Sequence, residues 1–476
     1  MSNTKSKKSH RRRGSFTGQI GFVMAAAGSA VGVGNLWRFP YLAAKDGGGL
    51  FILIYLILTL TFGYTLLISD ISIGRKTGKS SIKAYGQMNA KWSFLGVLTF
   101  LVPVIIMTYY AVIGGWITKY IVTFLTGQGE AAAADDYFTG FITSPGESSL
   151  YAVIFMLLTA FIVFNGVEKG IEKCSRVLMP LMLVMIIAIA VFTLTLSHTD
   201  ETGITRTGMQ GLAVYLKPNF EGLTVRRFLL ILLDAMSQIF FSLSVSMGIM
   251  ITYGSYIGKD VDINESVHQI EFFDTGVALL AGMMIIPAIY VFSGIDGMKA
   301  GPSLMFVSLP KIFASMGGLG RVVGLVFFLM AAFAALTSCV SVLETIVANC
   351  MELFGTPRHA TTIALTIIYT AASVVVALGY SVFYAEIPLP NGSIGQILDL
   401  MDYISNSLMM PFISLLSAIL IGWIVGSKWI ISEVEYGGHP FKHKRLYTTM
   451  IRYVVPAVML ILFLEAVGFP AFFLSK

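Results

Sequence analysis

The chain of 476 residues is 56% hydrophobic and only 12% charged, with a mean hydropathy of +0.79. A soluble protein must cover its surface with polar groups, so this composition excludes a soluble protein and indicates an integral membrane protein in a lipid bilayer. The net charge of +6 is interpreted as a membrane-topology signal, and no nucleic-acid partner is expected.

Apolar runs of about 20 residues are long enough to cross a bilayer, and about eleven occur along the chain. They are expected near residues 20–42, 49–74, 93–126, 148–165, 175–197, 226–257, 268–293, 320–354, 361–381, 397–426 and 447–473. The third, sixth, eighth and tenth exceed one straight crossing, so tilted or broken helices are expected.

The charged loops predict how the chain is oriented. Lys and Arg residues precede the first span and follow the second, whereas residues 127–147 hold four acidic residues and no Lys or Arg. Because cytoplasmic loops carry an excess of Lys and Arg, the N-terminus is expected in the cytoplasm and the C-terminus outside. A multi-pass protein of the plasma (inner) membrane is expected, with no cleaved signal peptide.

The sequence contains no motif that would indicate an enzyme or a disulfide-linked fold. The three cysteines, Cys174, Cys339 and Cys350, lie in or beside spans and suggest neither a disulfide framework nor a zinc site. The sequence also contains no HExxH, no phosphate-binding loop and no lipase-type serine elbow. We therefore expect no catalytic residues.

The first span contains a stretch, GSAVGVGNLWRFP, that is unsuited to a continuous helix. Each glycine costs a helix interior about 1 kcal/mol and proline about 3 kcal/mol. Close packing through the Gly28 and Gly32 pair is one explanation. Packing needs neither Asn35 nor Arg38, so we favour an irregular segment from Gly28 to Pro40 that lines a site.

A second irregular stretch is expected in the sixth span, within QIFFSLSVSMGIMITYGSY. Ser242, Ser244, Ser246 and Gly248 alternate with bulky residues, a period that favours an extended segment. The two stretches lie five spans apart. Paired interruptions at corresponding positions of two halves indicate the substrate site of a transporter.

These motifs carry a resemblance to a known family. GSAVGVGNLWRFPY…GGG resembles the first helix of the neurotransmitter:sodium symporter family, FFSLS…GIMITYGSY its sixth, TYY at 108–110 its third and ALTSCVS at 335–341 its eighth. The resemblance covers nearly the whole chain. It implies an all-α integral membrane protein of about 11 helices with the LeuT-type 5+5 inverted repeat and broken helices 1 and 6.

The resemblance also implies the chain's divisions and activity. Residues 1–19 would be a cytoplasmic basic tail, 20–197 the first repeat, 226–426 the second and 447–473 an eleventh helix. The activity implied is sodium-coupled secondary active symport, importing a neutral, hydrophobic or aromatic amino acid by alternating access.

The substrate site is carried over residue by residue. The family pattern assigns N–H groups of Val33 and Gly34 and the Tyr110 hydroxyl to the substrate carboxylate, and carbonyls of Ala30, Phe241 and Ser242 to its ammonium group. The full set expected to bind substrate is Ala30, Gly32, Val33, Gly34, Ile106, Tyr110, Phe241, Ser242, Ser244, Met247, Ser338 and Val342. Met247 and Ser246 depart from the family pattern, which leaves the exact amino acid open.

Two sodium sites are implied as well. The first would use Ala30, Asn35, Ser242 and Asp274 together with the substrate carboxylate, and the second Gly28, Val31, Ala334, Thr337 and Ser338. As lone residues, Thr337 and Ser338 would more often bond to the preceding helical turn. Asp274 replaces the asparagine of animal members, which bind chloride nearby. We therefore expect Asp274 to supply that negative charge and no chloride to be required.

Ion pairs are implied as gates on both sides. Arg38 and Asp402 would form the extracellular gate, and Arg13 and Glu352 the cytoplasmic one. Asp70 either braces the two broken helices or is an ordinary acid at the end of its span. Phe16 stands where many relatives have tryptophan, and Glu344 and Glu465 receive no role.

Two other readings stay open, a sensor that binds an amino acid without moving it and a sodium-conducting channel. A complete set of gates argues against a channel. The sequence leaves open the sodium stoichiometry, any proton counter-transport and the oligomeric state.

Overall fold

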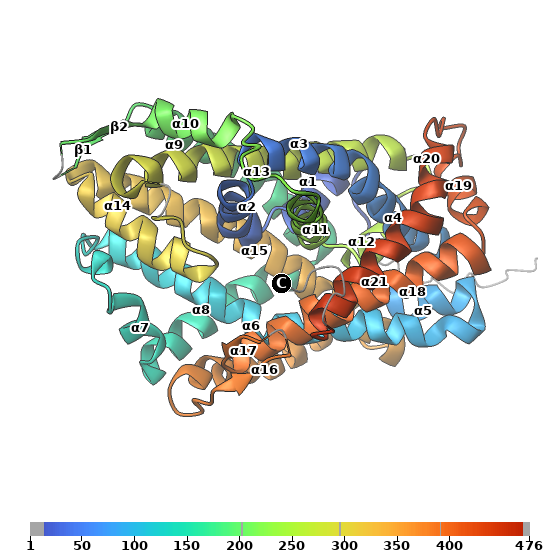
Figure 1. The fold of residues 1–476 in the computed structure, drawn as a ribbon. Helices are drawn as coiled ribbons and strands as arrows, with labels where there is room; N and C mark the ends of the chain where they lie inside the picture. The colour runs from blue at the N-terminus through green and yellow to red at the C-terminus, as the bar shows by residue number, and fades with distance from the viewer. Residues whose placement is uncertain (1–13, 201–202, 295–296, 391, 470–476) are drawn as a thin grey trace, which may run out of the picture.

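The computed structural model describes residues 14–200, 203–294, 297–390 and 392–469. In this part of the chain nearly every segment is helical, and long helices run side by side across the molecule (Figure 1). Two short hairpins are the exception, with β1 (Ser197–Thr199) antiparallel to β2 (Thr205–Thr207) and β3 (Ile387–Pro388) antiparallel to β4 (Ile394–Gly395).

The helices follow the predicted spans closely. The longer ones are α1 (Gln19–Ala30), α2 (Val33–Lys45), α3 (Gly49–Leu58), α4 (Tyr64–Thr77), α6 (Ser93–Leu125), α8 (Pro145–Phe164), α9 (Lys173–Leu194), α11 (Val225–Ser242), α13 (Ile263–Ser293), α15 (Gly318–Phe354), α16 (Arg358–Ala377), α18 (Met410–Ile419) and α21 (Val455–Ala466). Shorter ones are α5 (Ser81–Met88), α7 (Tyr137–Ile142), α10 (Gly208–Leu216), α12 (Ile249–Gly254), α14 (Leu309–Ser315), α17 (Ile397–Asp402), α19 (Lys428–Val434) and α20 (Lys444–Thr449).

Several spans contain a wide π-helical turn. Such turns join α3 to α4 (η1, Thr59–Gly63), precede α9 (η4, Val167–Glu172), join α17 to α18 (η8, Tyr403–Met409) and follow α18 (η9, Leu420–Ile424). The fifth span therefore begins at Val167, earlier than the predicted residue 175.

Nine helical stretches of the described residues are long and apolar enough to cross a membrane, and the bent pair α1–α2 makes up to ten. The sixth expected span is divided into α11 and α12, each of which falls short of that test. The helical membrane class agrees with the prediction, while the count of eleven spans stays a prediction.

The first break is shorter than the sequence predicts. Only Val31 and Gly32 separate α1 from α2, and the two helices meet at 56°. The prediction of an irregular segment from Gly28 to Pro40 is wrong in its extent, because α2 continues through Arg38 and Pro40 to Lys45. A proline inside a membrane helix is tolerated when neighbouring helices surround the freed backbone group, and Pro40 is buried.

The second break is not an extended segment, which corrects the other prediction. Between α11 and α12 the backbone of Ser244, Ser246 and Gly248 has φ of +53°, +61° and +77°. This left-handed region is costly for residues other than glycine. The period of two that predicted a strand therefore comes from alternate left-handed residues, which turn the chain between the two helices.

Two glycines bring α4 and α12 into backbone contact. A Cβ atom at Gly74 would lie 1.9 Å from the carbonyl oxygen of Ile251, and one at Gly254 would lie 2.4 Å from that of Ile71. Only glycine permits this approach. The segment after the second break is thus held directly against α4.

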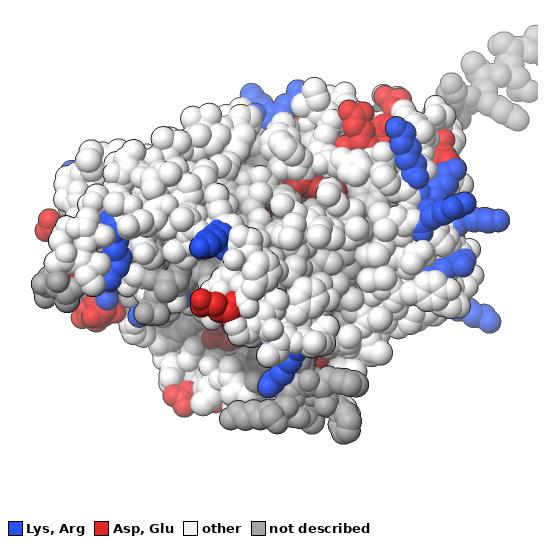
Figure 2. Space-filling model, turned by 45° about the horizontal axis from the view of Figure 1, so that its top comes forward, with Lys and Arg blue, Asp and Glu red and all other residues white. Residues whose placement is uncertain are grey.

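Charge is unevenly distributed over the ends of the helices. We call the end that carries β1, β2 and α7 the hairpin end and the end that carries α19 and α20 the linker end; they lie left and right in Figure 1. Figure 2 shows blue side chains gathered at the right of the molecule, where Figure 1 places α19 and α20. Lys428, Lys442, Lys444 and Arg445 are exposed there.

Candidate functional site

The two helix breaks meet in the interior of the bundle and are joined by hydrogen bonds. Ser244 Oγ donates to the carbonyl of Ser29 at 2.9 Å, and Ser338 Oγ on α15 donates to the same carbonyl at 3.1 Å. All three residues are buried. Backbone groups released by the breaks therefore converge with α15 rather than facing lipid, as irregular backbone at this depth requires.

A cavity of about 540 Å³ opens at this meeting point. It extends from Ser338 at the breaks past Arg38 to Glu465 on α21. All twelve residues expected to bind substrate line it: Ala30, Gly32, Val33, Gly34, Ile106, Tyr110, Phe241, Ser242, Ser244, Met247, Ser338 and Val342.

Gly32 lies close to Ser338 and Tyr110 in the cavity wall. A Cβ atom there would lie 3.3 Å from Ser338 Oγ and 3.4 Å from the Tyr110 hydroxyl. At Gly34 the same test finds open space. The Tyr110 hydroxyl therefore stands beside the backbone of the first break, where the sequence expected it.

Three of the four residues expected at the first sodium site, Asn35, Ser242 and Asp274, form one buried cluster at the edge of the cavity. Ser242 Oγ donates to Asp274, at 2.7 Å and 2.9 Å from its two oxygens, and Asn35 Nδ2 donates to Asp274 Oδ1 at 2.9 Å. Asn35 Oδ1 lies 3.3 Å from Ser242 Oγ and accepts the N–H of Gly32 at 3.1 Å. Amide, hydroxyl and carboxylate oxygens thus share a small volume.

The residues expected at the second sodium site lie together where the end of α1 meets α15. Ser338 Oγ lies 3.5 Å from the carbonyl oxygen of Gly28 and 3.3 Å from that of Val31. Thr337 Oγ1 lies 3.1 Å from the carbonyl oxygen of Ala334 and also donates to Phe333 one turn back. The threonine thus makes the ordinary helical back-bond, whereas the serine bonds across to the break.

The chemistry of these oxygen sets fits a monovalent hard cation. Both sets of residues contain uncharged oxygens from carbonyl, hydroxyl or amide groups. The set around Asp274 adds one carboxylate, and the set around Ser338 adds none. No group of three or more His, Cys, Asp or Glu side chains that could hold a metal ion occurs among the described residues. Oxygen ligands with little negative charge suit sodium better than a divalent ion.

The expected extracellular gate residues both line the cavity but face other partners. Arg38 donates to Ser237 Oγ at 2.7 Å and lies over the ring of Phe241 at 5.2 Å. Asp402 accepts from the Tyr109 hydroxyl at 3.0 Å and from Asn406 at 2.6 Å. Both residues belong to the described chain, and they make no ion pair with each other within 4.0 Å.

Side chains close the linker end. Phe16 packs edge-on against Tyr253 and Tyr256, and its N–H donates to the carbonyl of Tyr256 at 3.2 Å. Arg13 lies outside the described residues, so the expected pair with Glu352 is not placed. Glu352 accepts the N–H of Ser80 at 3.2 Å.

The structure gives partners to Glu344, which the sequence left without a role, and to Asp70, for which it left two roles open. Arg358 donates to both oxygens of Glu344, at 2.5 Å and 2.8 Å, and the Tyr256 hydroxyl donates at 2.7 Å. Asp70 accepts the N–H of Ser246 at 2.9 Å, so it contacts the second break. Glu465 is exposed in the cavity wall.

Sequence reasoning missed other residues of the cavity wall. These include Trp37, Tyr109, Ile113, Gln238, Asp399 and Asn406. Tyr109 and Ile113 share the apolar face of α6 with Ile106 and Tyr110, so helical spacing from those two residues is the signal that would have found them. Asp399 and Asn406 lie one helical turn before and after Asp402, so helical spacing from Asp402 would have identified them.

Known proteins are similar to this chain over nearly its whole length. The model of the sodium:neurotransmitter symporter family matches residues 13–139 and 134–471. An uncharacterised sodium-dependent transporter of Bacillus subtilis is 32% identical over 95% of this chain and 98% of its own length. A sodium-dependent transporter of Methanocaldococcus jannaschii is 28% identical over 90% of this chain and 87% of its own.

A solved structure is similar throughout. The crystal structure of MhsT in complex with L-phenylalanine superposes with a TM-score of 0.81 at 34% sequence identity, covering 96% of this chain and all of that chain. The LeuT-type fold class expected from the sequence is thereby confirmed, and the relatives are transporters rather than enzymes. The chain belongs to the sodium:neurotransmitter symporter family.

Proposed function

We propose that this protein imports a neutral amino acid with a hydrophobic or aromatic side chain together with sodium, by alternating access. The observation that carries the proposal is the meeting of two broken helices at a buried cavity, beside two clusters of oxygen ligands. Discontinuous helices that meet at mid-membrane are the binding device of secondary transporters.

The backbone at the first break supplies groups of both signs for a zwitterion. The first N–H groups of a helix have no partner within it, and the dipole makes that end attractive to a carboxylate. Val33 and Gly34 begin α2 and line the cavity, beside the Tyr110 hydroxyl. On the other side, the carbonyls of Ala30 and Phe241 accept the substrate ammonium group.

The remaining wall of the pocket favours an uncharged side chain. Ile106, Phe241, Met247 and Val342 are apolar and line the cavity, and a small-molecule site of this kind gains most from burying apolar surface. The complex of MhsT with L-phenylalanine supports an aromatic substrate. Met247, an adaptable side chain, supports a pocket that accepts aliphatic amino acids as well.

Sodium is coupled to the substrate through shared contacts. At the first site the substrate carboxylate completes the ligand set of Ala30, Asn35, Ser242 and Asp274, so each ligand raises the affinity for the other by the same factor. Asp274 is buried and carries the negative charge of this set. We propose that this charge makes transport independent of chloride.

The state of the gates assigns the direction of access. The cavity passes Arg38 and Asp402, which are not paired with each other, toward α21, whereas Phe16 and Glu344 are packed at the linker end. With the basic linker end in the cytoplasm, this is an outward-facing conformation of a plasma-membrane protein. Transport then requires the outer pair to close and the linker end to open.

Purified protein in proteoliposomes tests the function. An inward sodium gradient is expected to drive accumulation of labelled L-phenylalanine, and dissipating the gradient should abolish it. A panel of unlabelled amino acids then ranks the substrates, with apolar and aromatic ones competing and charged ones failing. Saturable binding without accumulation would instead indicate a sensor, and sodium flux that needs no amino acid a channel.

A further inference from the structure

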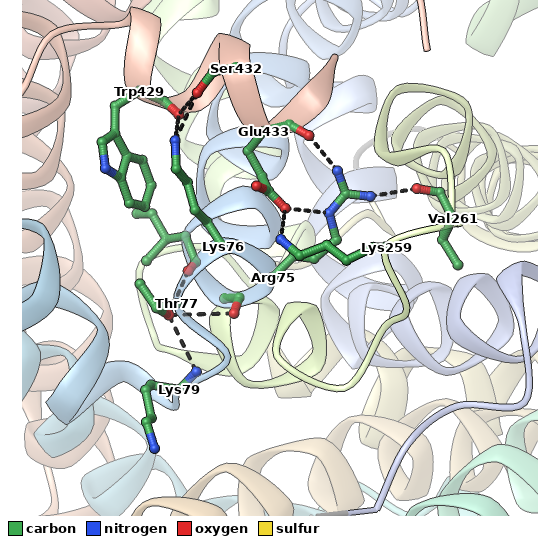
Figure 3. A network of polar contacts seen from close by, with 11 residues as sticks. Arg75, Lys76, Thr77, Lys79, Lys259, Val261, Trp429, Ser432 and Glu433 are labelled. Atoms are coloured by element: carbon green, nitrogen blue, oxygen red, sulfur yellow. Dashed lines mark hydrogen bonds and ion pairs between the residues drawn. The ribbon is translucent and has the colours of Figure 1, made fainter. Parts of the chain in front are cut away.

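The segment from Lys428 to Tyr447, here called the 428–447 linker, joins the tenth predicted span to the eleventh and contains α19. It is bound at several points to other parts of the chain at the linker end, and Figure 3 shows the contacts of Trp429, Ser432 and Glu433. Its partners lie on α4 or in the segment Lys259–Asp262, which leads from α12 to α13.

Arg75 at the end of α4 is the centre of these contacts. Its Nε donates to Glu433 Oε1 at 2.8 Å, its Nη1 donates to the carbonyl oxygen of Val261 at 2.5 Å, and its Nη2 donates to the carbonyl of Glu433. The side chains of Arg75 and Glu433 are 0% and 4% exposed. One guanidinium group thus joins three segments that are far apart in the sequence.

Further contacts extend the attachment in both directions. Lys76 Nζ donates to the carbonyl of Trp429 at 2.7 Å and lies 4.3 Å from the centre of its ring. Lys259 pairs with Glu433 at 2.6 Å, His439 lies 3.3 Å from Asp262, and the hydroxyls of Tyr447 and Ser69 lie 2.9 Å apart. The linker is therefore attached at successive points rather than by one pair.

The next part of the chain is attached elsewhere. After α4 ends at Thr77, the N–H of Ile82 and the hydroxyl of Ser81 donate to Asn349 on α15, at 3.1 Å and 3.3 Å. Between the two sets of contacts lies Gly78, with φ of +61°. The boundary between two groups of helices thus falls at a glycine turn, the kind of position that absorbs hinge motion.

Separating Arg75 from Glu433 would leave the buried Arg75 guanidinium without its carboxylate, while Glu433 would keep only Lys259. Breaking a pair of this kind slows a step by more than about 100-fold. A contact that had to open in every transport cycle would need a smaller free energy of separation. The ring packing of Phe16 at the same end is a contact of that weaker kind. The Arg75 contacts are stronger, as is expected for contacts inside a group of segments that moves as one rigid body.

We propose that Arg75 is a positioning residue that holds α4, the Lys259–Asp262 segment and the 428–447 linker together as one rigid body through the transport cycle. The proposal rests on the proposed alternating-access function, in which one bundle rocks against the rest around the site. The linker then travels with the broken sixth span, and the motion against α5 and α15 is taken up near Gly78.

Cross-linking tests whether the linker stays attached. The variant carries Asp262→Cys and His439→Cys in a background in which Cys174 and Cys350 are replaced by serine. A short bifunctional thiol reagent then links the two introduced cysteines. Uptake of L-phenylalanine is expected to stay within about 2-fold of that of the same variant before cross-linking. The matched pair is Thr17→Cys with Glu172→Cys, which joins the residues just before α1 to the turn η4 that precedes α9; there the Thr17 N–H donates to Glu172 at 2.9 Å. Cross-linking this pair should reduce uptake more than about 10-fold, because the linker end must open there.

Loss of uptake on joining residues 262 and 439 would overturn the proposal, since it would show that the linker must separate. The rate of cross-linking gives a readout that does not need transport. Adding sodium and L-phenylalanine should change the rate of cross-linking between residues 262 and 439 by less than about 2-fold. A change of more than about 10-fold in this rate would overturn the proposal. If uncross-linked protein fails to transport at all, the proposed function fails, and this rate still decides the rigid-body assignment.

The role of Arg75 has its own variants. Arg75→Gln is expected to lower the maximal uptake rate more than about 10-fold, with KM for the amino acid changed less than about 3-fold, because Arg75 is remote from the substrate. Arg75→Lys, which keeps the charge, should restore part of the rate. Lys79→Gln is the control, since its side chain points away from Glu433 in Figure 3. A rise in KM with an unchanged maximal rate in Arg75→Gln would contradict the positioning role.

Discussion

Replacing Asp274 by asparagine changes the charge of the first sodium site while keeping its shape. In the structure the Asp274 carboxylate is fully buried and accepts hydrogen bonds from Ser242 and Asn35. An amide can keep an oxygen facing the ion but lacks the negative charge. The variant Asp274→Asn therefore isolates the electrostatic part of sodium binding.

The size of the effect follows from the burial of the site. Two unit charges about 4 Å apart interact by about 4 kcal/mol at an effective dielectric constant of 20, and every 1.4 kcal/mol corresponds to about tenfold in affinity. The half-saturating sodium concentration is therefore expected to rise roughly 100- to 1,000-fold when chloride is absent, the lower figure allowing for the retained amide oxygen.

The assay is uptake of labelled L-phenylalanine into proteoliposomes over a range of sodium concentrations, in chloride and in gluconate. Wild-type uptake should be the same in both anions, whereas Asp274→Asn should regain activity in chloride as the anion supplies the missing charge. Two results would refute the reasoning: wild-type uptake that requires chloride, or a half-saturating sodium concentration of Asp274→Asn in gluconate that is within about 3-fold of that of wild type.

Three other predictions concern the cavity, the second ion and the charge at the end of α2. In Gly32→Ala the added methyl group would lie 3.3 Å from Ser338 Oγ and 3.4 Å from the Tyr110 hydroxyl, so KM for the amino acid should rise about tenfold; an unchanged KM would place the substrate elsewhere. Ser338→Ala removes the hydroxyl that faces the carbonyls of Gly28 and Val31, and the Hill coefficient for sodium in uptake should fall from about 2 toward 1; an unchanged coefficient would argue against a second ion there. Burial raises the pKa of Asp46 to about 7, with Lys45 opposing the shift. Because this folded-state pKa lies above the unfolded one, the associated stability is present below about pH 4 and is lost as pH rises through about 7. The melting temperature of wild type should thus fall from pH 5 to pH 8 by more than that of Asp46→Asn, and parallel profiles would contradict this assignment.

The sequence by itself determined the membrane class, the positions of the two breaks and the residues that meet there. Composition and run length indicate spans because the bilayer imposes both. Glycines and polar residues inside apolar runs are costly, so GSAVGVGNLWRFP was informative without any knowledge of its neighbours. The residues expected at the site were carried over from the family that this stretch resembles, and they line one cavity.

Only the tertiary structure decided how far each break extends and which partner each buried charge takes. Helix α2 runs through Pro40 while it packs mainly against α13 and α11, and the second break turns by left-handed residues rather than by extended ones where α12 packs against α4. In both places tertiary packing outweighs local preference. The partners of Glu344 and Arg75, which are Arg358 and Glu433, follow from which helix ends meet. A buried charge requires a partner, but sequence spacing does not name it, because the contact is made across the bundle.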